Sequence, residues 1–361
     1  MNEMKIVLKI GTNTLTRNGA IDDSFMGEIV GQIVNLKKEG NEIIIVTSGA
    51  IGFGAAELGI KQKVRDVKLR QATAAIGQII LMEKYAMLFR KYSVRVAQLL
   101  LSYADFSERK RYLNLNNSLE TLLKLGVVPI INENDPVAID EIGATFGDND
   151  KLSALIASKI EADTLILLTD VQGLYDKNPK SSKDARLIPY VHEITPEMIS
   201  SAEHAGSLFS KGGMKTKLHA AQICQDAGCN VIIAHGREKN VLQRSLKREI
   251  GTFFVARKRL RNKERWILHA STKGSITIDE GARAALLAHK DILPVGIVSW
   301  EGIFSDKDII EIKNIGKAIV NYSSTELEKI KGKKMSDVQH IIGRKGGAVV
   351  TRENVVFFEP Q

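Results

Sequence analysis

The chain has 361 residues, of which 44% are hydrophobic and 26% are charged. This composition is typical of globular proteins and excludes a disordered, collagen-like or disulfide-stapled chain. The length exceeds that of one typical domain, so the sequence predicts two. Lysine and arginine number 51 against 42 acidic residues, giving a net charge of +9, and such a basic balance can indicate nucleic-acid binding.

The excess positive charge is concentrated at one place in the chain. Residues 1–250 carry a net charge of only +3, and residues 266–361 carry +1. The stretch between them carries +5, from Arg257, Lys258, Arg259, Arg261, Lys263 and Arg265 against Glu264. Binding to phosphate backbones requires clustered cations, so this distribution argues against RNA binding by the C-terminal segment. An RNA-binding or regulatory protein stays open as an alternative of a different class.

The sequence shows no signal for export or membrane insertion. Its start, MNEMKIVLKI, lacks a basic region followed by a long apolar run, and no apolar stretch approaches about 20 residues. Cys224 and Cys229 have no nearby histidine or cysteine partner motif and are interpreted as reduced thiols. These observations predict a cytoplasmic protein without a membrane span.

Apolar runs alternate with amphipathic segments through the first 250 residues. The pattern predicts strands at 4–10, 42–47, 94–101, 127–131, 164–168 and 230–234, and helices at 24–38, 66–91, 108–124, 150–160 and 214–227. Strands that are apolar throughout and alternate with helices favour a mainly parallel sheet covered on both faces. We therefore predict a three-layer αβα sandwich over residues 1–256.

The last part of the chain has a different pattern. Short segments rich in valine, isoleucine and phenylalanine are separated by polar turns, and one helical pattern covers 279–289. This indicates a small β-rich, barrel-like domain at 274–361. The basic stretch then falls in a linker at 257–273, either solvated or packed on an acidic neighbour.

Polar residues follow the predicted strands, where parallel sheets bind ligands. Lys9 ends an apolar strand, which is costly unless its ammonium meets an anion or reaches solvent. Ser48 and Gly49 begin a glycine-rich strand-to-helix turn that can bind an anion but matches neither a dinucleotide fingerprint nor a P-loop. Either position taken alone is weak evidence.

Further polar clusters follow the later strands. Asn132 to Asp135 form a polar run that is either a plain turn or part of a site, and one residue of Asp148 to Asp150 can cap the next helix. Thr169 and Asp170 end another strand. The segment Lys211–Lys217 opens a helix with glycines and lysines, which indicates bound phosphate or else a solvated basic turn. With no nucleophile–histidine pair and no His/Cys cluster, this set is typical of phosphoryl transfer.

Six ordered motifs resemble the amino-acid kinase family: KIGTN, VTSGAIGFG, INENDPVA, FGDNDKLSA, LLTDVQGLY and KGGMKTK. The segment at about 274–352 resembles a PUA domain, so the resemblance covers nearly the whole chain. Within the family, the motifs resemble those of members that use ATP and Mg²⁺ to phosphorylate the γ-carboxylate of L-glutamate, the first step of proline synthesis. A kinase for another small acid, such as acetylglutamate, carbamate or a nucleoside monophosphate, is the alternative among enzymes.

The resemblance implies a role for each matched position. Lys9 would contact the transferred phosphoryl group, Lys217 would neutralise phosphate charge, and Asp150 would orient the two lysines. Glutamate would be held by Ser48, Gly49, Asp135 and Asn149. ATP would be held by Lys9, Thr169, Asp170, Lys211, Gly212, Gly213, Met214, Lys215, Thr216 and Lys217, with Mg²⁺ bridging the phosphates and no metal site built from protein side chains.

The chain departs from the family pattern in its basic loop. Lys211 stands where a threonine is usual, and Lys215 replaces a commoner small residue. Both changes add positive charge near the expected nucleotide, so affinity or selectivity for the nucleotide could differ. The family also implies feedback inhibition by proline and a homo-oligomer, either a dimer or a tetramer.

Overall fold

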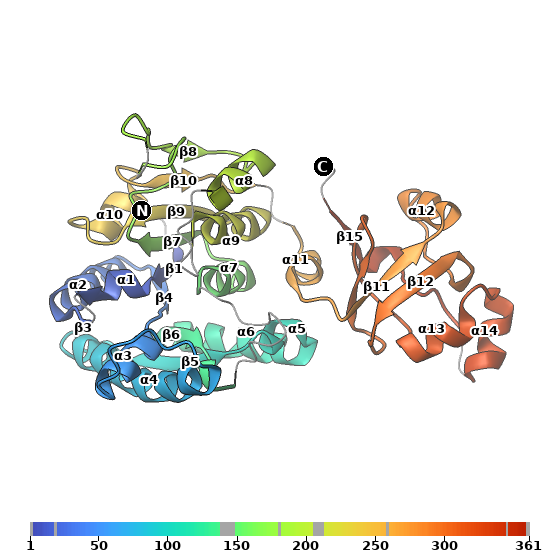
Figure 1. The fold of residues 1–361 in the computed structure, drawn as a ribbon, viewed down its shortest axis with the longest axis horizontal. Helices are drawn as coiled ribbons and strands as arrows, with labels where there is room; N and C mark the ends of the chain where they lie inside the picture. The colour runs from blue at the N-terminus through green and yellow to red at the C-terminus, as the bar shows by residue number, and fades with distance from the viewer. Residues whose placement is uncertain are drawn as a thin grey trace. The chain divides into compact units, whose positions relative to one another are not determined.

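The computed structural model describes residues 3–17, 20–137, 149–179, 182–204, 213–257, 260–343 and 346–358. The chain divides into two compact units, Met1–Arg259 and Leu260–Gln361. Each unit has its own hydrophobic core. Length alone predicted two domains, and each unit is described below by itself (Figure 1).

An eight-stranded sheet forms the centre of the N-terminal unit, in the order β5-β6-β4-β1-β7-β9-β10-β8. Strand β10 runs antiparallel to β9, and the other pairs are parallel, so the predicted mainly parallel sheet is confirmed. The strands are β1 (Lys5–Ile10), β4 (Glu42–Val46), β5 (Val96–Leu101), β6 (Val128–Glu133), β7 (Thr164–Thr169), β8 (Tyr190–Val191), β9 (Asn230–His235) and β10 (Thr252–Phe254). A separate two-stranded ribbon pairs β2 (Thr16–Arg17) with β3 (Ala20–Ile21).

Helices cover both faces of this sheet, because its strands point apolar side chains to each side in turn. Val7 of β1 packs in one core, whereas its neighbours Ile6 and Leu8 pack in the other. The helices are α1 (Thr12–Leu15), α2 (Asp23–Lys38), α3 (Ala50–Glu57), α4 (Val67–Arg90), α5 (Ala104–Ser107), α6 (Arg109–Lys124), α7 (Asn149–Lys159), α8 (Pro196–His204), α9 (Met214–Asp226) and α10 (Val241–Leu246), with a 3₁₀ turn η1 (Asp135–Val137).

The two cores show which helices share a face of the sheet. Residues of α2, α4 and α10 pack with Ile6 and Leu8, and residues of α6, α7 and α9 pack with Val7 (Figure 1). Cys224 and Cys229 are free thiols buried in the second of these layers, and burial raises the pKa of Cys224. The arrangement is the predicted αβα sandwich.

Helix α4 is long and apolar enough, by length and composition, to cross a membrane. It packs one face against the sheet, however, burying Leu81, Tyr85 and Phe89 in the core shared with α2. Its first turn is held by Asp66, whose side chain accepts from the Leu69 N–H at 2.8 Å. A helix packed in the core of a layered domain is apolar because its side chains are buried against other elements.

The C-terminal unit is built on a five-stranded sheet in the order β12-β11-β13-β14-β15. Its strands are β11 (Gly274–Ile278), β12 (Ile297–Gly302), β13 (Ile309–Ile312), β14 (Gly316–Ile319) and β15 (Val355–Phe357). Its helices are α11 (Asn262–His269), α12 (Glu280–Leu287), α13 (Ser324–Ile330) and α14 (Met335–Ile342), with 3₁₀ turns η3 (Pro294–Gly296) and η4 (Arg352–Asn354). The predicted strand-rich character is confirmed.

Several elements differ from the sequence expectation. Helix α11 lies inside the stretch expected to be a linker, and it contacts β14 and β15. Helices α13 and α14 and the short strands β8 and β10 are not among the predicted elements. Such short elements gain their stability from the core they join, which local sequence does not show.

Candidate active site

The carboxyl ends of the central strands meet at one edge of the N-terminal sheet. Strand β1 pairs in parallel with β4 on one side and with β7 on the other, which aligns Lys9 with Val46 and Leu167. Helix α3 begins just after β4, and the first turns of α7 and α9 reach this edge with Asp150 and Lys217, which contact each other there. The residues after the strands are therefore brought together, as the open α/β architecture requires.

Two lysines and one aspartate form a buried ionic cluster at this edge. Nζ of Lys9 lies 2.7 Å from Oδ1 of Asp150, and Nζ of Lys217 lies 3.0 Å from Oδ2. The hydroxyl of Thr216 also donates to Oδ2 at 2.9 Å. Asp150 is in the first turn of α7, and both Thr216 and Lys217 are in the first turn of α9. One carboxylate thus holds cations from two distant segments of the chain.

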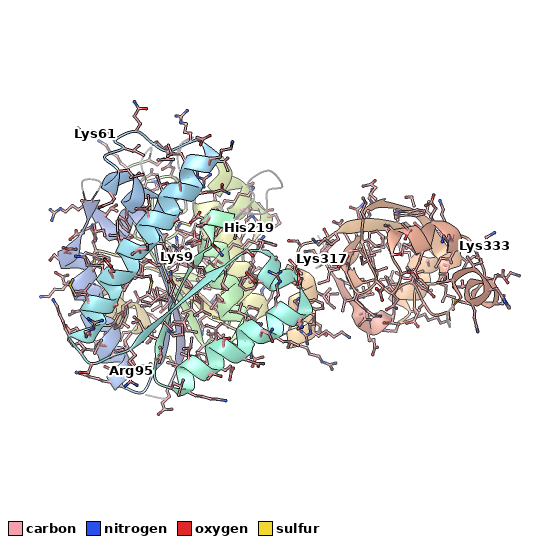
Figure 2. The ribbon with its side chains drawn as sticks, turned by 90° about the horizontal axis from the view of Figure 1, so that it is seen from below. Lys9, Lys61, Arg95, His219, Lys317 and Lys333 are labelled. Atoms are coloured by element: carbon pink, nitrogen blue, oxygen red, sulfur yellow. The ribbon has the colours of Figure 1, made fainter. Side chains whose placement is uncertain are left out.

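The cluster is almost closed to solvent. Asp150 is 0% exposed, Lys9 4% and Lys217 5%. Burial alone raises the pKa of Asp150, but the two ammonium groups outweigh burial and hold that pKa well below its usual range. Figure 2 shows Lys9 inside the unit, whereas Lys61 and Arg95 project from its surface. The carboxylate is ionised, and the cluster carries a net positive charge that an anion can share.

The loop after β1 connects the glycine turn to the end of β7. The hydroxyl of Thr12 donates to Oγ of Ser48 at 3.1 Å, and Ser48 donates to the Ile10 carbonyl at 3.0 Å. On the other side, Asn13 donates to Asp170 at 3.0 Å. Burial would raise the pKa of Asp170, but the Asn13 hydrogen bond and others lower it overall. These bonds fix the loop between the two halves of the site.

Gly49 makes the turn into α3 possible. Its φ is 101°, a left-handed conformation that favours glycine, and a Cβ there would lie 3.0 Å from the Phe53 ring. The Gly49 carbonyl accepts from the Phe53 N–H as the helix begins. The turn leaves the first amides of α3 near Ser48, where they can bind an anion.

A chain of side-chain amides lies beside the ionic cluster. Nδ2 of Asn149 donates to the Thr47 carbonyl and, at 2.7 Å, to Oδ1 of Asn132. Nδ2 of Asn132 in turn donates to Oε1 of Gln78 at 2.8 Å. Asn149, Asn132 and Gln78 are all buried. The amides therefore hold one another in fixed orientations.

Comparisons with known proteins decide the family. The model of the amino acid kinase family matches residues 4–235, which contain the ends of β1, β4, β6 and β7 that meet at this edge. The chain belongs to the amino acid kinase family. A PUA domain model matches residues 274–342, within the C-terminal unit.

Similar relatives in this family cover almost the whole chain. A glutamate 5-kinase of Methanosarcina acetivorans is 46% identical over 98% of this chain and 96% of its own length. One of Caldanaerobacter subterraneus is 46% identical over 99% of this chain and 98% of its own length. The solved carbamate kinase of Giardia lamblia bound to AMP-PNP shares the fold, with a TM-score of 0.52, 16% identity, and coverage of 71% of this chain and 99% of that one.

The structure places most of the residues expected in the kinase site at this edge. Lys9, Asp150 and Lys217 form the cluster, Ser48 and Gly49 form the adjoining turn, and Asn149 begins α7. Asp135 lies in η1 just after β6, and Thr169 and Asp170 end β7. Gly213, Met214 and Lys215 open α9. Lys211 and Gly212 lie outside the described residues.

Sequence reasoning missed Gln78 and Tyr85, which approach the same edge from α4. The Tyr85 hydroxyl lies 3.2 Å from that of Thr47, and Gln78 contacts Asn132. The available signal was a glutamine among the small and apolar residues of the run 74–82, on the buried face that also carries Gly77 and Leu81. A polar side chain there must have a partner, because an unpaired buried amide is costly.

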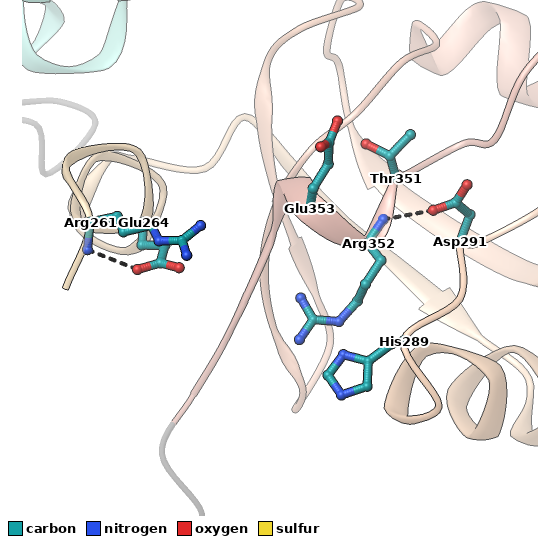
Figure 3. A pocket seen from close by; sticks show the side chains of 7 residues that line it. All are labelled: Arg261, Glu264, His289, Asp291, Thr351, Arg352 and Glu353. Atoms are coloured by element: carbon teal, nitrogen blue, oxygen red, sulfur yellow. Dashed lines mark hydrogen bonds between the residues drawn. The ribbon is translucent and has the colours of Figure 1, made fainter.

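A second hollow lies within the C-terminal unit. Figure 3 shows its lining, which consists of Arg261, Glu264, His289, Asp291, Thr351, Arg352 and Glu353. Its lining includes basic and acidic side chains, and two of the acids accept from backbone N–H groups: Glu264 from that of Arg261 and Asp291 from that of Arg352, each at 2.8 Å. This mixed lining lacks the concentrated positive charge that a phosphate backbone requires.

Proposed function

We propose that the N-terminal unit transfers the γ-phosphoryl group of ATP to the γ-carboxylate of L-glutamate. The observation that carries the proposal is the bridge from Lys9 through Asp150 to Lys217 at the carboxyl edge of the sheet. The relatives named glutamate 5-kinase, which match 98–99% of the chain at 46% identity, support glutamate as the acceptor. The near-neutral balance of residues 266–361, net +1, does not favour an RNA-binding function.

The cluster suits a transfer between two anions. A carboxylate and a phosphoryl group repel each other, so a cation on each side of the transferred group lowers the barrier. Lys9 comes from the central strand and Lys217 from the start of α9, so they approach Asp150 from different elements. Asp150 stays ionised between them and fixes where both ammonium groups point.

Each substrate then has its own side of the site. We assign glutamate to Ser48, Gly49, Asp135 and Asn149, which follow β4 and β6. We assign ATP to Thr169, Asp170 and the segment 211–217, with Lys217 reaching its phosphates. Thr12 and Asn13, in the first turn of α1, join the two sides through their bonds to Ser48 and Asp170, and so hold donor and acceptor in register.

The donor set fits a Mg²⁺ ion carried mainly by the nucleotide. The described residues bring no three metal-binding side chains together, and Asp150 is already neutralised by two lysines. Mg²⁺ in kinases is held by substrate phosphates with few protein ligands. When bound, it would shield phosphate charge, while Lys9 and Lys217 position the transferred group.

Hydroxylamine trapping tests the proposed reaction directly. Purified protein with ATP, Mg²⁺ and L-glutamate should yield the γ-hydroxamate of glutamate, because hydroxylamine captures an acyl phosphate. Omission of ATP is the control. Hydroxamate from another small acid but none from glutamate would overturn the assignment of the substrate.

Regulation and assembly follow the same family resemblance. We propose that proline inhibits by competing near the glutamate side, and that the chain forms a dimer or tetramer. The trapping assay with and without proline, at several glutamate concentrations, tests the first. Gel filtration with light scattering tests the second, and a monomer at working concentration would contradict it.

A further inference from the structure

Gln78 is brought to the site by an unusually close contact between α3 and α4. A Cβ on Gly77 would lie 1.9 Å from the Ala50 carbonyl oxygen, and one on Gly54 would lie 1.8 Å from that of Thr73. Glycine at both positions lets the two backbones touch. Helix α3 starts at the Gly49 turn, so this contact ties α4 to the site itself. Gly54 of the glycine-rich segment thus serves the packing of the two helices.

Two residues on one face of α4 then reach the ends of neighbouring strands. Gln78 and Tyr85 are seven positions apart and so share a helix face. Tyr85 contacts Thr47 after β4, and Gln78 contacts Asn132 at the end of β6. The helix therefore acts on both strands that precede the glutamate side.

The hydrogen bonds permit only one orientation of the amides. Oδ1 of Asn132 accepts from Asn149 Nδ2 and from the Glu133 N–H at 2.9 Å, so both lone pairs are used. Its Nδ2 must then face an acceptor, which is Oε1 of Gln78. Reversing Asn132 would place its NH₂ group against two other donors. The Glu133 N–H and the Thr47 carbonyl set the sense of this chain of bonds, and the Gln78 oxygen holds the Nδ2 end of Asn132.

The consequence appears at Asn149. Both hydrogens of its NH₂ group are used, by Thr47 and by Asn132. Its Oδ1 takes part in no hydrogen bond with the described residues, so the atom it offers to a ligand is an acceptor. In glutamate the ammonium is the one strong donor, since both carboxylates only accept.

We propose that Gln78 is a positioning residue which, through Asn132, turns the Asn149 carbonyl oxygen toward the substrate and so selects ligands that carry an ammonium group. A second observation agrees with a role at a ligand site. Gln78 is 8% exposed, and its Nε2 has no hydrogen-bond partner among the described residues. Such a buried orphan donor is costly and is rarely kept for packing alone.

The test is a double-mutant cycle on glutamate binding, and it rests on the proposed function. Gln78→Met keeps the shape of the side chain but loses the acceptor for Asn132. The proposed hydrogen bond from the glutamate ammonium to Asn149 Oδ1 should then weaken, and the glutamate KM should rise about tenfold or more, as expected for a hydrogen bond to a charged group. The kcat and the KM for ATP should stay within about threefold. In an Asn149→Ala background the same change should add less than about twofold, because the relay ends at Asn149.

Gln225→Met is the matched control. Gln225 is also buried, and its Nε2 donates to the carbonyls of Val255 and His192, away from the site. This variant should lower the melting temperature and leave the glutamate KM unchanged. A similar KM rise in both glutamine variants would show a general packing effect and overturn the proposal.

The remaining outcomes are equally decisive. A glutamate KM within twofold of wild type in Gln78→Met, or the same factor in both Asn149 backgrounds, overturns the relay. If Gln78→Met does not fold, Gln78→Glu, which keeps an oxygen facing Asn132, is run in the same cycle. An unchanged glutamate KM, or a change in that KM that disappears in the Asn149→Ala background, supports the hydrogen-bonded chain from Gln78 through Asn132 to Asn149. An equal change of the glutamate KM in both backgrounds overturns it. Absence of hydroxamate from the wild type would instead refute the proposed function.

Discussion

The two units treat charge in opposite ways. At the carboxyl edge of the N-terminal sheet, one fully buried carboxylate holds two buried ammonium groups, and a chain of amides fixes the neighbouring donors and acceptors. In the C-terminal unit, the hollow between α11 and η4 mixes cations and anions, and its acids accept from backbone N–H groups. The net charge of a unit therefore does not locate a reactive site, whereas the burial and pairing of individual charged side chains do.

Removing the central carboxylate should have the largest effect. Asp150→Asn leaves two buried lysines facing each other, and loss of one partner of a buried ion pair costs about 3–5 kcal/mol. Urea unfolding measures this cost, and the trapping assay should show a kcat loss of about 10²-fold or more. The exposed pair of Lys177 with Asp184 is the control, since Asp184→Asn should cost less than about 1 kcal/mol. Equal losses of unfolding free energy in Asp150→Asn and Asp184→Asn would contradict the difference expected between the buried and the exposed carboxylate.

The same aspartate sets a pH dependence with a definite sign. Its pKa is lowered in the folded state, so its stabilisation is present above the unfolded value near 4 and is lost as pH falls toward the folded value. Urea unfolding from pH 7 down to pH 3 should therefore show a smaller loss of stability in Asp150→Asn than in the wild type. A steeper loss in the variant would contradict the ionised assignment.

The two buried lysines should matter next. Lys9→Ala and Lys217→Ala should each lower kcat by about 10²-fold or more, because each removes a charge that stabilises the transition state. Lys84→Ala, which removes the ammonium that pairs with Asp23 at 2.8 Å, is the control and should leave kcat unchanged. Near-normal turnover in either site variant would refute its role.

A smaller effect is expected at the start of α2, away from the cluster. Asp22 accepts from the Phe25 N–H at 3.1 Å and pairs with Arg237 at 2.6 Å, and the Arg237 hydrogen bond is the main cause of its lowered pKa. Asp22→Ala loses both contacts and should cost about 1–2 kcal/mol of unfolding free energy. Asp22→Asn keeps the cap and should cost less. Equal costs would assign the whole effect to the ion pair.

The smallest effect should come from the C-terminal hollow. Arg261→Ala with Arg352→Ala should leave the kinase rate within about twofold, since neither residue belongs to the proposed site. RNA filter binding by the wild type should be weak and should show no steep dependence on salt. A steep slope, lost in the double variant, would show that this unit binds a phosphate backbone after all.

Much of the fold could be predicted because its strands are apolar throughout. The run Lys5–Ile10 and the helix Asp23–Lys38 carry their own burial patterns and end signals, and the side chain of Asp22 caps that helix. Helix α11 could not be predicted in the same way. Its sequence is dominated by charge, and its stability comes from packing on β14 and β15.

The residues of the candidate site likewise fall into those that the sequence predicts and those that it does not. Position at or after the strand ends was enough to predict Lys9, Ser48 and Thr169 at one edge, because parallel strands end together, whereas Asn149 was expected there only from the family resemblance. Gln78 was not predictable, since it lies mid-helix and reaches the site only through the glycine contact of α3 with α4.

The sequence by itself determined the layered N-terminal domain, the strand-rich C-terminal segment and the set of polar residues at the strand ends, because each depends on local pattern. The family resemblance already implied that Asp150 orients Lys9 and Lys217, but only the tertiary structure showed that all three are buried and in contact. It also decided how the side-chain amides are oriented. Both depend on contacts between residues far apart in the chain, and burial gives those contacts their strength.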